Sequence, residues 1–203
     1  MGASIEEIKS LKDLTGVGLT SAKKALEEAD GDFEKAVEAM RVKGISKADT
    51  KSEREAKAGL IEAYVHSDRI GVMVEVNCET DFVARTDDFK NFAHDIAMHI
   101  AASAPRYISE ADVTPEALKK EEQLIRAELK ESGKPDEMID KITEGKLKKF
   151  HEEVCLLNQP YIKNPDQKVG DLLKETIAKL GENMVIRQMS RIELGGQTDG
   201  SGN

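Results

Sequence analysis

The side chains that most often do chemistry are few in this sequence and poorly spaced for it. His94 and His99 are five residues apart, which on a helix places them about 140° apart rather than on one face. A zinc site of the HExxH type needs two histidines one turn apart. His66 and His151 have no local serine, cysteine or aspartate arrangement that would make them catalytic. We therefore expect surface or half-buried histidines and no metal site.

Phosphate-binding motifs are also missing from the sequence. Gly16-x-Gly18-x-x-Ser21 is the nearest match to a dinucleotide fingerprint, but it has no third glycine and follows a predicted helix, not a strand. No GxxxxGK[ST] loop is present. The cysteines, Cys78 and Cys155, are isolated and lack metal-ligand spacing. We expect a chain that is not an enzyme and that carries no cofactor.

The composition is that of a globular protein, with 39% hydrophobic and 34% charged residues. The 30 Lys and Arg are outnumbered by 39 Asp and Glu, which gives a formal net charge of −9. Phosphate backbones are bound mainly by Lys and Arg, so a basic protein surface is a better partner than a nucleic acid. Two lone cysteines indicate a reducing compartment, and no apolar run approaches the ~20 residues of a membrane span. We expect a cytoplasmic protein that binds no membrane.

The residues best placed to act by binding lie at positions 76–85, between a predicted strand and a predicted helix. A loop between two rigid elements is a good place to present side chains. Thr80 or Asp81 could equally cap a helical turn, and Phe82 could be a core residue, as most large apolar side chains are. From the residues alone, a contact loop and a purely structural loop both stay open.

The elements that must position this loop predict an α+β core. Residues 60–66 and 70–78 are rich in Val, Ile and Tyr and flank a short turn, which predicts an antiparallel hairpin with Val72, Val74 and Val76 on one face. Residues 87–102 have apolar side chains at helical spacing, with Thr86 or Asp87 as the cap. The remaining expected elements are helices at 116–131, 136–156 and 170–180 and a late strand at 184–194.

The first 45 residues predict three short helices, the last of which Gly44 would end. A core of this size is marginal alone. The pattern resembles a ubiquitin-associated (UBA) module, in which the loop between the first two helices is the exposed contact tip. Here that tip is Gly16, Val17 and Gly18, although glycines at these positions could serve only to make a tight turn.

These changes of pattern divide the chain into four predicted segments. They are a UBA-like three-helix module at 1–45, a charged linker at 46–57, an α+β core at 58–194 and a disordered tail at 195–203. The fold class is therefore α+β, with a small antiparallel sheet packed against helices.

Several motifs resemble those of the elongation factor Ts family. Asn77-Cys-Glu-Thr-Asp-Phe-Val-Ala84 resembles the family signature, and Leu14-Thr-Gly-Val-Gly-Leu19 resembles its opening module. Gly133-Lys-Pro135, Leu157-Asn-Gln-Pro-Tyr161 and Gly181-Glu-Asn183 resemble its middle and C-terminal parts. The resemblance covers nearly the whole chain in the right order, which is far more specific than one short motif.

The resemblance implies a guanine-nucleotide exchange factor that binds elongation factor Tu with GDP and promotes GDP release and GTP loading. Thr80, Asp81, Phe82 and Val83 would form the exchange element. Phe82 would insert into an apolar crevice on the GTPase, and Asp81 would disturb the region that supports its magnesium ion. Such exchange needs no covalent chemistry, because factor and nucleotide weaken each other's binding reciprocally.

The resemblance also implies partner contacts outside this element. Tyr64 and His66, with Gly71 on the next strand, would touch the phosphate-binding side of the GTPase, and Leu180 and Gly181 would form another contact. His66 could instead be only a strand-end residue, and Gly181 only the end of a helix.

The oligomeric state and a second function stay open. Short members of the family are expected to form homodimers, and some have a late-strand cysteine where this chain has Ser190. A disulfide through that strand is therefore excluded, but a non-covalent homodimer is not. The alternative function is a UBA-type adaptor or scaffold without exchange activity, which would bind its partner without changing the rate of nucleotide release.

Overall fold

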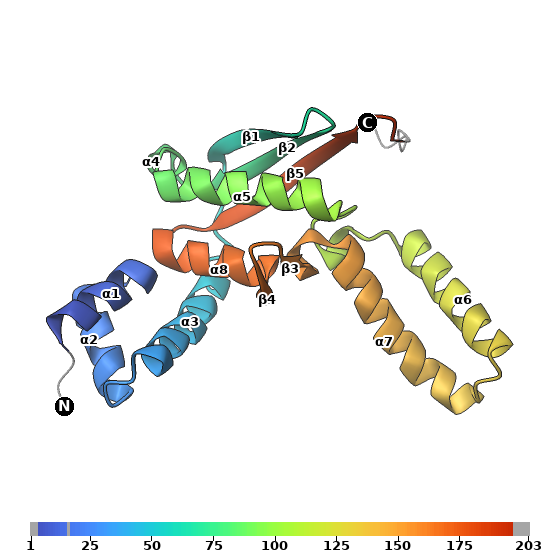
Figure 1. The fold of residues 1–203 in the computed structure, drawn as a ribbon, viewed down its shortest axis with the longest axis horizontal. Coiled ribbons are helices and arrows are strands. Elements are labelled where there is room, and N and C mark those ends of the chain that lie inside the picture. The colour runs from blue at the N-terminus through green and yellow to red at the C-terminus, as the bar shows by residue number, and fades with distance from the viewer. Residues whose placement is uncertain (1–3, 16, 197–203) are drawn as a thin grey trace.

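The computed structural model describes residues 4–15 and 17–196 of the chain. The predicted tip residue Gly16 and most of the predicted tail lie outside the described residues. A small antiparallel sheet and its covering helices form the centre, with helical extensions toward opposite ends of the molecule (Figure 1). The α+β prediction is confirmed, and the first three helices fit a UBA-like module.

The sheet has the strand order β1-β2-β5 and is antiparallel throughout. β1 (Ala58–His66) and β2 (Ile70–Cys78) form the predicted hairpin, and β5 (Met184–Glu193) pairs with the other edge of β2. Because side chains alternate between the two faces of a strand, every second residue of β2 faces the helices. We call this the inner face, and it is buried at the predicted positions Val72, Val74 and Val76.

α5 (Asp87–Ser103) covers the inner face, and α8 (Val169–Leu180) packs beside α5 (Figure 1). The helical spacing of apolar residues gives α5 one buried stripe, formed by Phe89, Phe92, Ala93, Ile96, Ala97 and Ile100. The hydroxyl of Thr86 accepts a hydrogen bond from the backbone N–H of Phe89 at 3.3 Å. Of the two caps that the sequence allows, Thr86 is therefore the one used.

The N-terminal helices α1 (Ile5–Thr15), α2 (Leu19–Glu28) and α3 (Phe33–Asp49) share a small core of their own. The predicted end of α3 at Gly44 is wrong, because the helix continues across the predicted linker boundary and packs against α8. A Cβ at Gly44 would lie 3.1 Å from the Cβ of Ala178, so this glycine permits close approach of the two helices. The division of the chain into domains stays a prediction.

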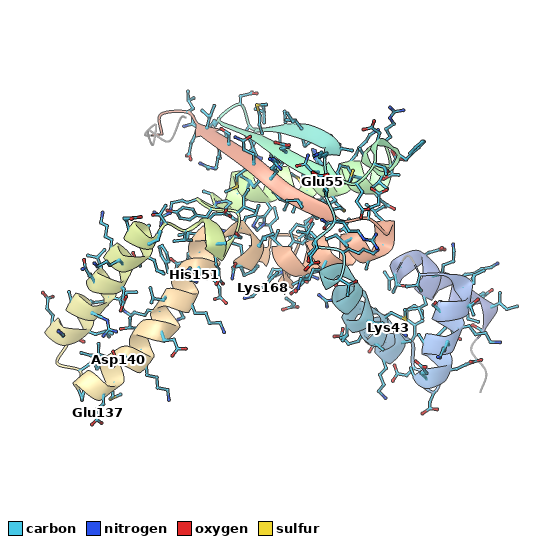
Figure 2. All side chains as sticks on the ribbon, turned by 180° about the vertical axis from the view of Figure 1, so that it is seen from behind. Lys43, Glu55, Glu137, Asp140, His151 and Lys168 are labelled. Atoms are coloured by element: carbon cyan, nitrogen blue, oxygen red, sulfur yellow. The ribbon has the colours of Figure 1, made fainter. Side chains whose placement is uncertain are left out.

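α6 (Pro115–Glu131) and α7 (Asp136–Val154) form a helical hairpin that extends away from the sheet. Figure 2 shows Asp140 toward the far end of the hairpin, where its carboxylate accepts a hydrogen bond from Arg126 of α6 at 2.7 Å. α7 ends two residues before the prediction because Cys155 is extended and precedes the 3-10 turn Leu156–Asn158. Another 3-10 turn, Glu110–Asp112, lies before α6.

The strands β3 (Pro160–Tyr161) and β4 (Asn164–Lys168) form a two-stranded ribbon that the sequence did not predict. They are too short and too polar to give an alternating hydrophobic pattern. His99 of α5 joins this region to the core and is fully buried, so the expectation of a surface or half-buried histidine is wrong there. Its Nδ1 accepts a hydrogen bond from the backbone N–H of Ile162 at 3.3 Å, and its Nε2 lies 2.9 Å from Oε1 of Gln159. A neutral imidazole with its proton on Nε2 satisfies both partners.

The burial of His99 predicts a loss of stability in mild acid. Burial lowers the pKa of His99 from its ordinary value of 6.5. At pH values between the lowered pKa and 6.5, the unfolded chain binds more protons than the folded chain. The contribution of neutral His99 to the free energy of unfolding is therefore complete above pH 6.5 and is lost as the pH falls. We expect the free energy of unfolding to fall below pH 6.5 by up to about 1.4 kcal/mol per pH unit from this one group.

Urea denaturation between pH 5 and 7 measures this dependence. The His99→Gln variant keeps a donor and an acceptor but cannot titrate, so its stability should fall less steeply with acid. If the free energy of unfolding falls equally steeply with acid in the wild type and in His99→Gln, the loss of stability does not come from His99.

Candidate partner-binding site

Residues 80–83, the predicted exchange element, form a one-turn helix between β2 and α5. Thr80 has extended backbone angles and caps α4 (Asp81–Ala84), accepting a hydrogen bond from the backbone N–H of Val83 at 3.5 Å. Asp81 is the first helical residue, so it is not the cap. Val83 packs partly against the main core and Ala84 is buried, which leaves the opposite side of the turn for Asp81 and Phe82.

Phe82 is 85% exposed, more than any other large hydrophobic side chain in the described residues. The interpretation of Phe82 as a core residue is therefore wrong. Burial of such a side chain is worth roughly 1.5–3 kcal/mol, which the free chain does not gain. Asp81, its neighbour, is exposed as well. The turn thus presents an apolar ring and a carboxylate together at the surface.

The predicted contact residues Leu180 and Gly181 lie next to this turn. Leu180 packs partly against the core, and Gly181 ends α8 in a left-handed conformation with φ of 82°. The following residue, Glu182, accepts hydrogen bonds from the backbone N–H of Thr80 at 2.9 Å and from its hydroxyl at 2.7 Å. The fold therefore brings the exchange element and the end of α8 together.

Glu182 is a residue to which the sequence assigned no role. It lies 102 positions from Thr80, and no local spacing relates the two. Its only sequence signal was its place in the Gly181-Glu-Asn183 motif.

Tyr64 and His66 lie close together but far from the exchange element. The Tyr64 hydroxyl is 3.0 Å from Nδ1 of His66, and the Tyr64 ring meets the ring of His94 edge-on at 5.5 Å between centroids. His66 pairs with Ile70 at one end of the hairpin, whereas Cys78 ends β2 at the other. At about 3.3 Å per residue, nine-residue strands separate the two ends by about 26 Å. These residues form a separate candidate contact.

The described part of the N-terminal tip comprises Val17 and Gly18. Val17 packs partly against the core of the three-helix module. Gly18 is the N-cap of α2 with φ of −67°, and a Cβ added there would meet no atom within 4 Å. Neither backbone conformation nor local packing requires glycine, so the tight-turn interpretation does not explain Gly18. The flanking residues Leu14 and Leu19 are 62% and 52% exposed.

An open cleft of about 400 Å³ is lined by residues of the three-helix module on one side and of α8 and β4 on the other. Its charged lining residues are already engaged, since Arg41 of α3 pairs with Glu175 of α8, which also accepts a hydrogen bond from Gln167 at 2.7 Å. These paired side chains therefore join the three-helix module to the core across the cleft.

The other side chains with chemical potential are held in structural contacts. Both cysteines are buried, and burial raises the pKa of Cys155 to about 11. Nδ1 of His94 lies 2.8 Å from a carboxylate oxygen of Glu62. Over residues 4–15 and 17–196, no group of three or more His, Cys, Asp or Glu side chains is placed to hold a metal. No helix in the same ranges is long and apolar enough to cross a membrane.

The sheet face away from α5, here called the outer face, carries a second exposed surface. The register places Met73 opposite Ala63 on one side and Ser190 on the other. Exposed apolar side chains come from all three strands: Ile61 (64%), Val65 (63%), Met73 (54%) and Ile192 (72%). Among the described residues, these four side chains stay more than half exposed.

Together these features define an α+β protein whose candidate sites are surfaces rather than an enclosed pocket. Residues 3–195 match the model of the family described as Elongation factor TS. An elongation factor Ts from Carboxydothermus hydrogenoformans is 54% identical over 93% of this chain and 87% of its own length. One from Thermodesulfovibrio yellowstonii is 48% identical over 98% of this chain and 100% of its own length. The chain belongs to the elongation factor Ts family and is thus a translation elongation factor.

The exposure of Phe82 predicts that its side chain contributes little to folding. Phe82→Ala should change the free energy of unfolding by no more than about 0.5 kcal/mol, as expected for a surface position. Phe89, which is fully buried in α5, is the matched control, and Phe89→Ala should cost about 3–5 kcal/mol. Urea denaturation of both variants checks this pair. A cost near that of Phe89→Ala for Phe82→Ala would mean that Phe82 is buried in solution.

Proposed function

We propose that this chain is the guanine-nucleotide exchange factor of elongation factor Tu. It binds the GTPase with GDP, disturbs the magnesium and phosphate site, and promotes GDP release and GTP loading. The observation that carries the proposal is the exposure of Phe82 beside Asp81 on a turn fixed to a rigid core. An aromatic ring that is 85% exposed in the free chain is available for burial in a partner.

The mechanism follows from where these two side chains would go. Phe82 inserts into an apolar crevice of the GTPase and gains the roughly 1.5–3 kcal/mol of burial that it lacks in the free chain. Asp81 enters the same region and displaces the segment that supports the magnesium ion. Because that ion neutralises the phosphates, its displacement leaves the diphosphate poorly compensated and GDP dissociates.

The remaining predicted contacts extend the footprint beyond this turn. Leu180 and Gly181 adjoin the exchange element, and Tyr64 with His66 reaches the same partner about 26 Å away along the hairpin. The tip of the three-helix module docks on a further surface, and the missing side chain of Gly18 permits close approach of the partner backbone. Figure 1 shows α4 and the three-helix module toward the same end of the molecule.

Exchange by this route requires no enzyme chemistry and no cofactor of the chain's own. Factor and nucleotide each weaken the binding of the other by the same ratio, so GTP binding in turn releases the factor. We place the protein in the cytoplasm, with the translation machinery, and assign it neither a nucleic-acid nor a membrane partner.

A UBA-type adaptor without exchange activity is the second candidate, favoured by the three-helix module. It makes a different kinetic prediction. An adaptor binds elongation factor Tu or another partner and leaves the rate of nucleotide release unchanged, whereas an exchange factor raises it.

Release of a fluorescent GDP analogue from elongation factor Tu tests the proposal. The wild-type chain should accelerate release, and Asp81→Ala/Phe82→Ala should lose at least about tenfold of that acceleration, since it removes both acting groups. Leu124→Ala is a matched control, because Leu124 is 58% exposed on α6, and it should behave as wild type. Binding without acceleration by the wild type would favour the adaptor.

We also propose that two copies pair through the outer face. The four exposed apolar side chains on this face span all three strands, and two sheets stacked about 10 Å apart would bury them. Ser190 lies on the same face, opposite Met73, so such a dimer is non-covalent.

Sedimentation velocity at micromolar concentration tests the dimer. The wild type should sediment as a dimer and Met73→Glu as a monomer, because a buried carboxylate without a partner is strongly unfavourable. Met138→Glu is the control, since Met138 is 50% exposed on α7, away from the sheet. A monomeric wild type would refute pairing through this face.

A further inference from the structure

The polar groups of Thr80 are all engaged. Its backbone N–H and its hydroxyl both donate to the carboxylate of Glu182, at 2.9 Å and 2.7 Å. Its carbonyl accepts from the thiol of Cys78 at 3.2 Å and from the backbone N–H of Ala84 at 3.3 Å. Burial and the charge of Glu182 raise the pKa of Cys78, so the thiol stays protonated and able to donate. Thr80 is therefore held through its amide, its carbonyl and its hydroxyl.

A second carboxylate makes the reciprocal contact between the same two loops. Glu79, just before Thr80, accepts a hydrogen bond from the backbone N–H of Asn183 at 2.6 Å. The buried side-chain amide of Asn183 donates to the carbonyl of Arg54 at 2.6 Å, and the Arg54 guanidinium lies 3.5 Å from Glu79. The loop before α4, the loop after α8 and the segment after α3 are therefore tied into one network.

The exchange element cannot hold its own shape without such support. α4 has only four residues, and a single helical turn is unfavourable to form because it orders several residues for one or two hydrogen bonds. Hydrogen bonds to a carboxylate are roughly twice as strong as neutral ones. Glu182 accepts two of them from Thr80, the residue that begins the turn. Phe82 follows Thr80 by two residues.

The chemistry of the contact favours glutamate at position 182. Thr80 presents two donors, and a carboxylate offers one acceptor oxygen to each. Glutamine could accept from the backbone N–H and donate to the hydroxyl, so it would keep neutral contacts but lose the charge that strengthens them, while alanine would make neither contact. The substitutions Glu182→Gln and Glu182→Ala therefore form a graded series.

We infer that Glu182 is a positioning residue for nucleotide exchange, which fixes the orientation of Asp81 and Phe82 by holding Thr80 without itself contacting the partner. The inference rests on the proposed function and deepens it by naming the residue on which the exchange element depends. Glu79, on the same loop as Thr80, and Asn183, on the loop of Glu182, hold the two loops together through a second hydrogen bond.

Amide hydrogen exchange of the free chain tests the positioning alone, with no partner present. In Glu182→Ala the backbone amides of Val83 and Ala84 should exchange about tenfold faster or more, because the start of the turn is released. The exchange rates of these amides in Glu182→Gln should lie between those of the wild type and of Glu182→Ala. Amides within α5 should keep their protection in both variants. Glu128→Ala, which removes a surface ion pair with Lys146 on the helical hairpin, should change neither region. Unchanged protection at Val83 and Ala84 in Glu182→Ala would overturn the inference.

The kinetics of GDP release test the consequence for exchange. Glu182→Ala should lower the rate at saturating factor about tenfold, with a change of less than about threefold in the half-saturating concentration, because docking surfaces elsewhere are intact. Glu182→Gln should recover part of that rate. In an Asp81→Ala/Phe82→Ala background, Glu182→Ala should change the residual rate by less than about twofold, since it acts through those two side chains.

A loss of equal size in both backgrounds would overturn the inference, because Glu182 would then act on the partner directly. A wild-type chain that fails to accelerate release would refute the proposed function instead. In that case the amide measurement still decides whether Glu182 positions the turn.

Discussion

The burial of α5 against the inner face of the sheet is the contact on which the rest of the structure depends. It fixes the end of β2 at Cys78 and the start of α5 at Asp87, so residues 79–86 must cross from one to the other in a single short turn. Val83 and Ala84 are directed into the same core, and Asp81 and Phe82 are consequently directed outward. The exposure of Phe82 is a result of core packing on both sides of it and not of a loose loop.

An exposed side chain is useful in binding only if its backbone is already ordered. Ordering a loop during association costs free energy that would offset the burial of one ring. In this chain the loop is ordered during folding, through charge-assisted hydrogen bonds that Thr80 donates to Glu182 and Asn183 donates to Glu79. In the exchange mechanism that we propose, most of the gain from burying Phe82 is then available to the complex and can be coupled to nucleotide release.

The sequence predicted those parts of the fold that local periodicity specifies. The hairpin, α5 and its apolar stripe, and the late strand have patterns strong enough to be assigned within one or two residues. The passage of α3 through Gly44, the burial of His99 and the ribbon of β3 and β4 depend on contacts between distant segments, which periodicity does not contain. The same limit applies to the candidate site. Thr80 to Val83 was found from its motif, but the exposure of Phe82 and the contact of Thr80 with Glu182 are visible only when the two loops meet in space.

The central claim is that the chain binds elongation factor Tu most tightly when the nucleotide is absent, and that Phe82 produces the difference. The most direct measurement is calorimetric titration of elongation factor Tu with the chain, once with GDP bound and once free of nucleotide. The wild type should bind the nucleotide-free form more tightly, by the same ratio by which it weakens GDP binding. Phe82→Ala should bring the two affinities together, chiefly by weakening binding to the nucleotide-free form. Equal affinities of the wild type for the two forms would contradict the account.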